Sequence, residues 1–159
     1  MIIREMMPED VKQVAAIEAQ CFSLPWSEKS FLDSISRDDT VFLVAESESI
    51  TEGATVPADR GHSSKIRGYI GMYNSFEEGE ITNVAVSLEY RNQGIGDALV
   101  TAIRSAGKEK KLERIVLEVR VSNTSALSLY KRKGFTELGI RKNFYEKPTE
   151  DAIIMACEI

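Results

Sequence analysis

The chain has 159 residues, of which 43% are hydrophobic and 28% are charged, and its formal net charge is -5. These values predict a single globular domain, residues 1–159, with enough apolar residues to bury a core without disulfide bonds or metals. The acidic balance argues against a general nucleic-acid-binding protein, and no apolar run approaches the roughly 20 residues needed to span a membrane.

The N-terminal part predicts a short strand and two helices. Residues 2–5 form the strand, and Pro8 with the two acidic residues after it begins the first helix, as helix N-termini favour. The buried stripe of that helix is expected from Val11, Val14, Ala15 and Ile17. Ser27 is a candidate N-cap of the second helix, after an aromatic, proline-containing connection.

Two strands then flank a polar insertion. Residues 40–46 and 66–73 have the β-branched and apolar content of strands. Between them, residues 47–65 are rich in Ser, Glu, Gly and Pro, which predicts an exposed loop or a disordered segment. This segment either recognises a partner or is a solvated insertion in a hairpin, and in the second case the two strands pair with each other.

The cysteines and the histidine limit the chemistry of the chain. Cys21 and Cys157 form no close-spaced metal or redox motif, and we expect free thiols in a reducing cytoplasm. Residues 1–5 carry no signal-peptide pattern, which agrees with a cytoplasmic location. His62 is the only histidine and lies in the insertion, so we expect no metal site and assign any chemistry to carboxylates, tyrosines or backbone groups.

A strand, a glycine turn and a helix follow each other in residues 81–108. Residues 81–88 predict the strand, and Ile95 begins an amphipathic helix whose further apolar residues are Ala98, Leu99, Ala102, Ile103 and Ala106. The turn contains Gly94 and Gly96, and the unpaired N–H groups at such a helix start attract phosphate. The turn therefore indicates either phosphate binding or an ordinary tight turn. It matches neither a Rossmann fingerprint, because Leu99 replaces the third glycine or alanine, nor a Walker A loop.

The next strand, residues 114–121, carries a carboxylate among apolar residues. One face is expected from Ile115, Leu117, Val119 and Val121, and Glu118 lies on the other face. A carboxylate in such a strand costs free energy unless it is paired, hydrogen-bonded or at a cleft. Glu118 is therefore either a functional group, a member of an ion pair with a neighbouring arginine, or part of a solvated face.

The C-terminal part predicts a helix and two strands. Ser122 or Asn123 caps the helix, and Gly134 ends it. A strand begins at Phe135 and continues towards the segment 140–145, and residues 151–156 form the last strand.

Several motifs resemble those of the GCN5-related N-acetyltransferases, the GNAT family. Residues 91–96, RNQGIG, are similar to the R/Q-x-x-G-x-G/A pyrophosphate loop of the family. Residues 118–135, EVRVSNTSALSLYKRKGF, closely resemble the segment E-V-R-x-S-N-x-x-A-x-x-L-Y-x-x-x-G-F of enzymes that acetylate protein N-termini. With the early CFSLPW and the late RKNFY and EDAIIM, the chain resembles the RimI branch of ribosomal protein alanine N-acetyltransferases, apart from residues 47–65.

The resemblance implies a fold and a reaction. The fold is α/β (α+β): a central mixed, mostly antiparallel sheet of about six to seven strands, flanked by about four helices. The strands that carry Val86 and Glu118 are expected to splay apart and admit acetyl-CoA. The acceptor is expected to be the N-terminal α-amine of a protein, the N-terminal alanine of a small-subunit ribosomal protein, attacking directly in a ternary complex.

The site residues follow from the same match. Glu118 is expected to be the base, directly or through one water, and Tyr130 the acid that protonates the CoA sulfur. The alternative for Tyr130 is a core tyrosine. Contacts to acetyl-CoA are expected from Val84, Ala85 and Val86 at the pantetheine arm, from Asn92, Gln93, Gly94, Ile95, Gly96 and Asp97 at the pyrophosphate, and from Asn123, which is also a candidate cap.

The acceptor site is expected between two aromatic segments. Its candidate walls are Phe22, Leu24, Pro25, Trp26, Phe144 and Tyr145, each of which is alternatively a core or hinge residue. Glu77, Glu78 and Glu80 either attract a basic peptide or are simply solvated.

Two other functions keep part of this pattern. A GNAT enzyme that acetylates a small amine or a lysine side chain needs the same cosubstrate residues. A CoA-binding module without catalysis needs neither Glu118 nor Tyr130, so the presence of both favours an enzyme. No direct nucleic-acid or membrane partner is expected.

Overall fold

The computed structural model describes residues 1–47 and 65–159. The predicted insertion lies almost wholly outside the described residues, and so does His62. The described strands are β1 (Ile2–Glu5), β2 (Thr40–Glu46), β3 (Ile66–Ser75), β4 (Glu78–Val86), β5 (Arg114–Arg120), β6 (Thr136–Tyr145) and β7 (Glu150–Glu158). The described α-helices are α1 (Val11–Cys21), α2 (Glu28–Ile35), α3 (Ile95–Glu109) and α4 (Thr124–Arg132), with short 3-10 turns at Pro8–Asp10 and Leu88–Tyr90.

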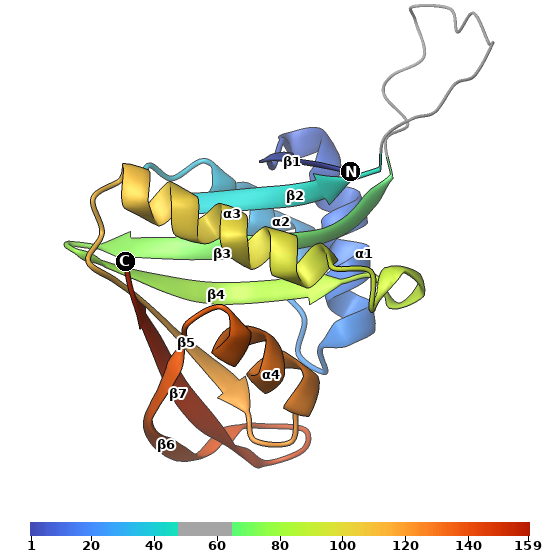
Figure 1. The fold of residues 1–159 in the computed structure, drawn as a ribbon. Helices are drawn as coiled ribbons and strands as arrows, with labels where there is room; N and C mark the ends of the chain where they lie inside the picture. The colour runs from blue at the N-terminus through green and yellow to red at the C-terminus, as the bar shows by residue number, and fades with distance from the viewer. Residues whose placement is uncertain (48–64) are drawn as a thin grey trace, which may run out of the picture.

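The strands form one mixed sheet in the order β1-β2-β3-β4-β5-β7-β6 (Figure 1). All neighbouring strands are antiparallel except β4 and β5, which are parallel. The predicted pairing across the insertion is confirmed, because β2 and β3 pair along their length and the Ser47 N–H bonds the Lys65 carbonyl at 2.9 Å. The predicted fold class, with its mostly antiparallel sheet and four flanking helices, is confirmed over the described residues.

The described strands β1 to β4 are joined to β5, β7 and β6 only by a short parallel pairing between β4 and β5. Glu78, Gly79 and Glu80 pair with residues 114–116, and the two strands then diverge (Figure 1). Beyond that point β4 stays paired with β3 as far as Val86, and β5 stays paired with β7 as far as Arg120. A register shift between Gly71 and Met72 bends the β3–β4 pair at the same place. The expected splay is therefore present, and the backbone of residues 81–86 faces β5 without a β5 partner.

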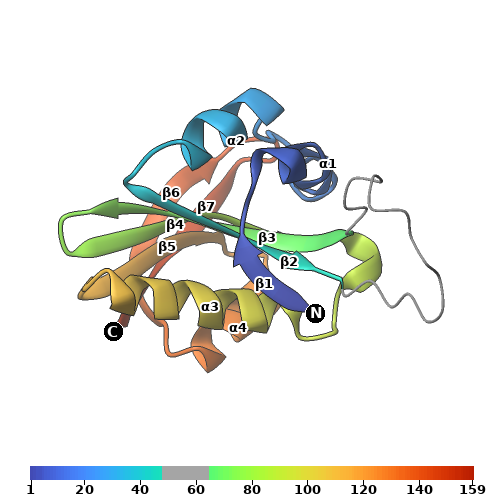
Figure 2. The ribbon, with the colours of Figure 1, turned by 90° about the horizontal axis from the view of Figure 1, so that it is seen from above.

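Helices cover both faces of the sheet. Figure 2 shows α1 and α2 on one face and α3 and α4 on the other. The core under α3 and α4 includes the fully buried Leu99, Ile103, Ile115 and Met155, and the core under α1 and α2 includes Val14, Phe31, Val44 and Tyr69. Within the described residues, no helix is long and apolar enough to cross a membrane.

Capping residues mark the start of α2 and the end of α4. The Ser27 hydroxyl accepts the Ser30 N–H at 3.1 Å, which confirms Ser27 as the N-cap of α2. Gly134 follows α4 with φ of 90°, a left-handed conformation that glycine adopts at low cost.

Several predicted strand bounds are wrong. β3 runs to Ser75 rather than Tyr73, β4 begins at Glu78 rather than Ile81, and β7 spans Glu150–Glu158 rather than residues 151–156. β4 stops at Val86 rather than Leu88, because the Tyr90 N–H bonds the Ser87 carbonyl and closes a 3-10 turn that leaves Leu88 55% exposed. Val121 lies one residue beyond β5 and is 38% exposed, so it does not belong to the buried face of that strand.

Candidate active site

The turn before α3 has the backbone of an anion site. Asn92 and Gly94 have φ of 62° and 81°, and Gly94 is the left-handed N-cap of α3. A Cβ at Gly94 would meet nothing within 4 Å, so the glycine serves its backbone conformation and not a close contact. At Gly96 a Cβ would lie 3.2 Å from the Leu129 side chain, so this glycine allows α4 to approach α3. The turn thus combines the unpaired N–H groups of a helix start with room for a ligand.

Two of the predicted cosubstrate residues have structural partners of their own. The Asp97 carboxylate lies 2.5 Å from Lys133 Nζ, so a phosphate would meet Asp97 through its backbone N–H. The Asn123 side-chain oxygen accepts the Ala126 N–H at 3.2 Å, which confirms Asn123 as the N-cap of α4. Because the cap uses the amide oxygen, the amide nitrogen of Asn123 can still donate to a ligand.

The turn lies beside the open edge of β4. The Arg91 guanidinium reaches back to the Val86 carbonyl at 3.4 Å and to the Cys21 sulfur at 3.2 Å. The structure therefore brings together the predicted pyrophosphate turn and the predicted pantetheine strand, residues 84–86.

Glu118 lies on the β5 edge of the splay, on the sheet face that carries α1 and α2. Its side chain is 19% exposed, and Arg141 Nε lies 3.3 Å from its Oε1. Burial raises the pKa of Glu118, the positive charge of Arg141 opposes that shift, and the negative charge of Glu80 adds to it. The ion pair considered from the sequence is present, and burial nevertheless leaves Glu118 with an enhanced proton affinity beside the gap.

One tyrosine, Tyr145, couples electrostatically to this carboxylate, and a second, Tyr130, couples to Tyr145. Burial raises the pKa of Tyr145 to about 12, and the charge of Glu118 adds to the shift. Burial also raises the pKa of Tyr130, with a further contribution from Tyr145. Tyr130 is 5% exposed and its ring packs 5.7 Å from that of Phe135, as a core tyrosine would. Both phenols keep their protons at neutral pH.

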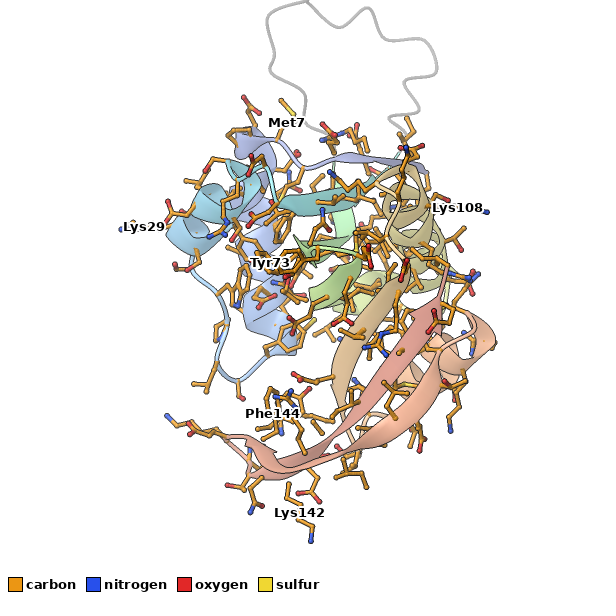
Figure 3. All side chains as sticks on the ribbon, turned by 90° about the vertical axis from the view of Figure 1, so that its left-hand side faces the viewer. Met7, Lys29, Tyr73, Lys108, Lys142 and Phe144 are labelled. Carbon is orange, nitrogen blue, oxygen red and sulfur yellow. The ribbon has the colours of Figure 1, made fainter. Side chains whose placement is uncertain are left out.

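The end of the β6–β7 hairpin forms one side of this face. The Phe144 and Tyr145 rings meet edge to face at 5.0 Å, and the Arg120 guanidinium lies 4.4 Å from the Tyr145 ring centre. Figure 3 shows Phe144 on the side of the hairpin that faces the α1–α2 connection, whereas Lys142 points away from it. Phe144 is 42% exposed, so an apolar ring is available to a ligand there.

The α1–α2 connection, residues 22–27, supplies the opposite side. Its exposed apolar side chains are Phe22, Leu24 and Pro25. Trp26 differs from them, because its ring packs 5.3 Å from Phe31 and 6.2 Å from Phe42. Trp26 also borders a cavity of about 360 Å³, whose lining continues through Ser34, Arg37, Thr40, Phe42, Tyr73 and Thr82.

Two of the three predicted glutamates, Glu78 and Glu80, differ in how their charge is used. Glu78 accepts from the Arg114 guanidinium at 2.7 Å, so its charge is paired. Glu80, two residues further on, lies close enough to Glu118 to raise the pKa of that residue. Glu80 therefore contributes to the negative potential beside the gap.

Glu18 is a buried carboxylate, 3% exposed, that was not among the residues predicted from the sequence. A signal for it was present, because Glu18 lies four residues after Val14 and seven after Val11, on the buried stripe of α1. In residues 1–47 and 65–159, no group of three or more His, Cys, Asp or Glu side chains is arranged to hold a metal.

The family model of the acetyltransferase (GNAT) family matches residues 11–135 of this chain. The chain belongs to the GNAT family of acetyltransferases. A Bacillus subtilis relative, whose name assigns it provisionally to the [ribosomal protein bS18]-alanine N-acetyltransferases, is 38% identical over 96% of this chain and 92% of its own length. The [ribosomal protein bS18]-alanine N-acetyltransferase of Escherichia coli K12 is 30% identical over 99% of this chain and 97% of its own.

Solved structures agree with this assignment. The crystal structure of the ribosomal-protein-S18-alanine N-acetyltransferase from Escherichia coli superposes with a TM-score of 0.83 at 28% identity, over 99% of this chain and 93% of that one. This GNAT protein is therefore an N-acetyltransferase, and its RimI-type resemblance is confirmed.

Proposed function

We propose that this GNAT enzyme transfers acetyl from acetyl-CoA to the N-terminal α-amine of a protein, in a ternary complex. We further propose that its acceptor is the N-terminal alanine of a small-subunit ribosomal protein. The proposal is supported by the Escherichia coli relative, which is named a [ribosomal protein bS18]-alanine N-acetyltransferase. The observation that carries the proposal is the open edge of β4, which faces Glu118 across the gap between β4 and β5. We place the reaction in the cytoplasm, where the free Cys21 and Cys157 would stay reduced.

The residues around the gap fit acetyl-CoA. An extended pantetheine arm can add to the edge of β4 as a further strand, bonded to the main chain of Val84, Ala85 and Val86. Its pyrophosphate would then meet the N–H groups of residues 92–97 at the start of α3. Asn123 would hold the arm from the α4 side with its amide nitrogen. Acetyl-CoA supplies an acetyl group activated as a thioester.

We assign the two proton transfers of the reaction to Glu118 and Tyr130. Glu118 takes a proton from the ammonium form of the acceptor, directly or through one water, so that the neutral amine forms the C–N bond. Tyr130 gives its phenolic proton to the sulfur as the C–S bond breaks. A backbone N–H of the β4 edge stabilises the negative charge on the thioester oxygen. The nitrogen loses its second proton to solvent as the amide forms, and solvent returns a proton to Tyr130. Release of the first proton from Glu118 to solvent leaves one proton produced per acetyl group transferred.

The acceptor would enter between the α1–α2 connection and the hairpin end. Exposed Phe22, Leu24 and Phe144 provide apolar contacts on both sides of its first residues. Glu80 and Glu118 attract its positively charged amine.

A peptide panel tests the acceptor class. The protein is incubated with acetyl-CoA and peptides that begin with free Ala, Ser or Met, together with an N-terminally blocked peptide that contains a lysine. Mass spectrometry locates the added acetyl group. We expect acetylation of the free N-termini, with the Ala-starting ribosomal sequence preferred. Acetylation of the blocked peptide alone would move the enzyme to the lysine class, and silence with every peptide would favour a small-amine acceptor.

A further inference from the structure

A buried carboxylate that the proposed reaction does not use connects three elements beside the acceptor entrance. Glu18 lies in the last turn of α1 and is 3% exposed. Its Oε1 accepts the backbone N–H of Trp26 at 3.3 Å, and the Tyr69 hydroxyl of β3 donates to its Oε2. Asn83 of β4 lies close enough to lower the pKa of Glu18, although the Asn83 amide nitrogen makes no hydrogen bond of good geometry among the described residues.

The Glu18 contacts close the α1–α2 connection into a loop. The backbone carbonyl of Glu18 accepts the Phe22 N–H at 3.0 Å, and its carboxylate accepts the Trp26 N–H. Both ends of the segment 22–26 are thus held by one residue. Phe22 and Leu24, two exposed apolar side chains of the proposed acceptor wall, lie between these two bonds.

The same carboxylate faces the point where β4 leaves β5. Asn83 pairs with Gly71 at the register shift of the β3–β4 pair, and its side-chain oxygen accepts the Thr82 hydroxyl at 2.8 Å. Thr82 and Trp26 both line the cavity of about 360 Å³ on this face of the sheet. A displacement of Glu18 would therefore release the connection 22–26 from its hold on β3.

We propose that Glu18 is a positioning residue for the acceptor: its carboxyl group holds the connection 22–27 against β3 and β4, and so sets the wall that the incoming N-terminus contacts. The inference rests on the proposed N-terminal acetyltransferase function only for the identity of the acceptor. The Glu18 carboxyl bonds Trp26 and Tyr69, and neither of these residues belongs to the predicted acetyl-CoA contacts. Its loss should therefore affect the acceptor and spare acetyl-CoA.

The test compares E18A and E18Q with D10A. Asp10 is a matched control, because it is also a buried carboxylate beside α1, 5% exposed and paired with Arg4 at 2.7 Å, away from the connection. If the wall is correctly placed in only about a tenth of E18A molecules, the KM for the Ala-starting peptide rises about 10-fold. We expect that rise in E18A with an unchanged Kd for acetyl-CoA. E18Q, whose amide oxygen can accept the Trp26 N–H, should restore most of the peptide affinity.

A second readout does not need turnover. Trp26 is the only tryptophan of the chain, so intrinsic fluorescence reports on the connection directly. We expect the emission of E18A to shift to longer wavelength and that of E18Q and D10A to stay close to wild type. If E18A does not fold, Y69F removes one donor to Glu18 and should show a smaller shift of the same kind.

Two outcomes would overturn the positioning role. One is a wild-type peptide KM and Trp26 emission in E18A, and the other is an equal effect in D10A, which would reveal general destabilisation. If wild type acetylates no peptide, the proposed function fails, and the Trp26 emission of E18A against D10A still decides the positioning role.

Discussion

Ionisation of Glu18 should make folding stability depend on pH. Burial raises the pKa of Glu18 from 4.5 to about 7 in the folded protein, against the lowering effects of Trp26 and Asn83. The folded state therefore retains a proton that the unfolded state releases, and the stabilisation present below pH 4.5 is lost as the pH rises through 7. With about 1.4 kcal/mol for each pKa unit, the whole titration removes about 3 kcal/mol of the free energy of unfolding.

The variant E18Q isolates this contribution, because its amide is neutral at every pH and close in shape to the protonated acid. Urea denaturation of both proteins, followed by Trp26 fluorescence, gives the free energies of unfolding. We expect the free energy of unfolding of E18Q, relative to that of wild type, to rise by about 2.5 kcal/mol between about pH 5 and about pH 8. E9Q, at an exposed glutamate, controls for the change in net charge. If the difference in free energy of unfolding between wild type and E18Q is constant with pH, or favours wild type at high pH, the pKa of Glu18 is not raised in the folded protein.

Three further variants test separate parts of the site. G94A should lose about 1 to 2 kcal/mol of unfolding free energy, because a left-handed φ of 81° is strained for alanine. G139A is the control, because Gly139 has equally open surroundings and no left-handed φ, so it should not lose this stability. Urea denaturation measures both variants. N123A should lose about 1 kcal/mol with the N-cap of α4, and N123D should retain it in the same assay. R141A removes the cation 3.3 Å from Glu118, so the pKa of that carboxyl rises and the acid limb of the kcat/KM profile should move to higher pH, which R141K should largely prevent.

Much of the fold could be predicted because local signals and tertiary packing agree. The strand β2 has the predicted bounds, and the amphipathic period of α3 places Leu99 and Ile103 in the core. The caps Ser27 and Asn123 bond the backbone N–H groups expected of such residues. The strand ends at Leu88 and Val121 were wrong, because an apolar side chain at each of these positions extends the sequence pattern past the point where the backbone bonds of the strand stop.

The site could be predicted only in part, because its contacts join residues that are far apart in the sequence. The carboxylate of Glu118 stood out in its strand, but nothing local to it indicated Arg141 as its partner or Tyr145 as its neighbour. Glu18 carried a usable signal, a charge on the buried stripe of α1, yet its partners Trp26 and Tyr69 are set by how the connection packs on β3. The roles of Glu118 and Tyr130 as base and acid stay predictions.

One measurement tests the central claim that Glu118 accepts the proton of the acceptor amine. The kcat for an Ala-starting peptide is measured in wild type and E118Q, and acetyl-CoA binding is measured in both by calorimetry. We expect E118Q to bind acetyl-CoA as wild type does and to lose at least about 100-fold in kcat, the usual contribution of a positioned base. Turnover by E118Q at the wild-type rate, with acetyl-CoA bound equally well, would contradict this claim.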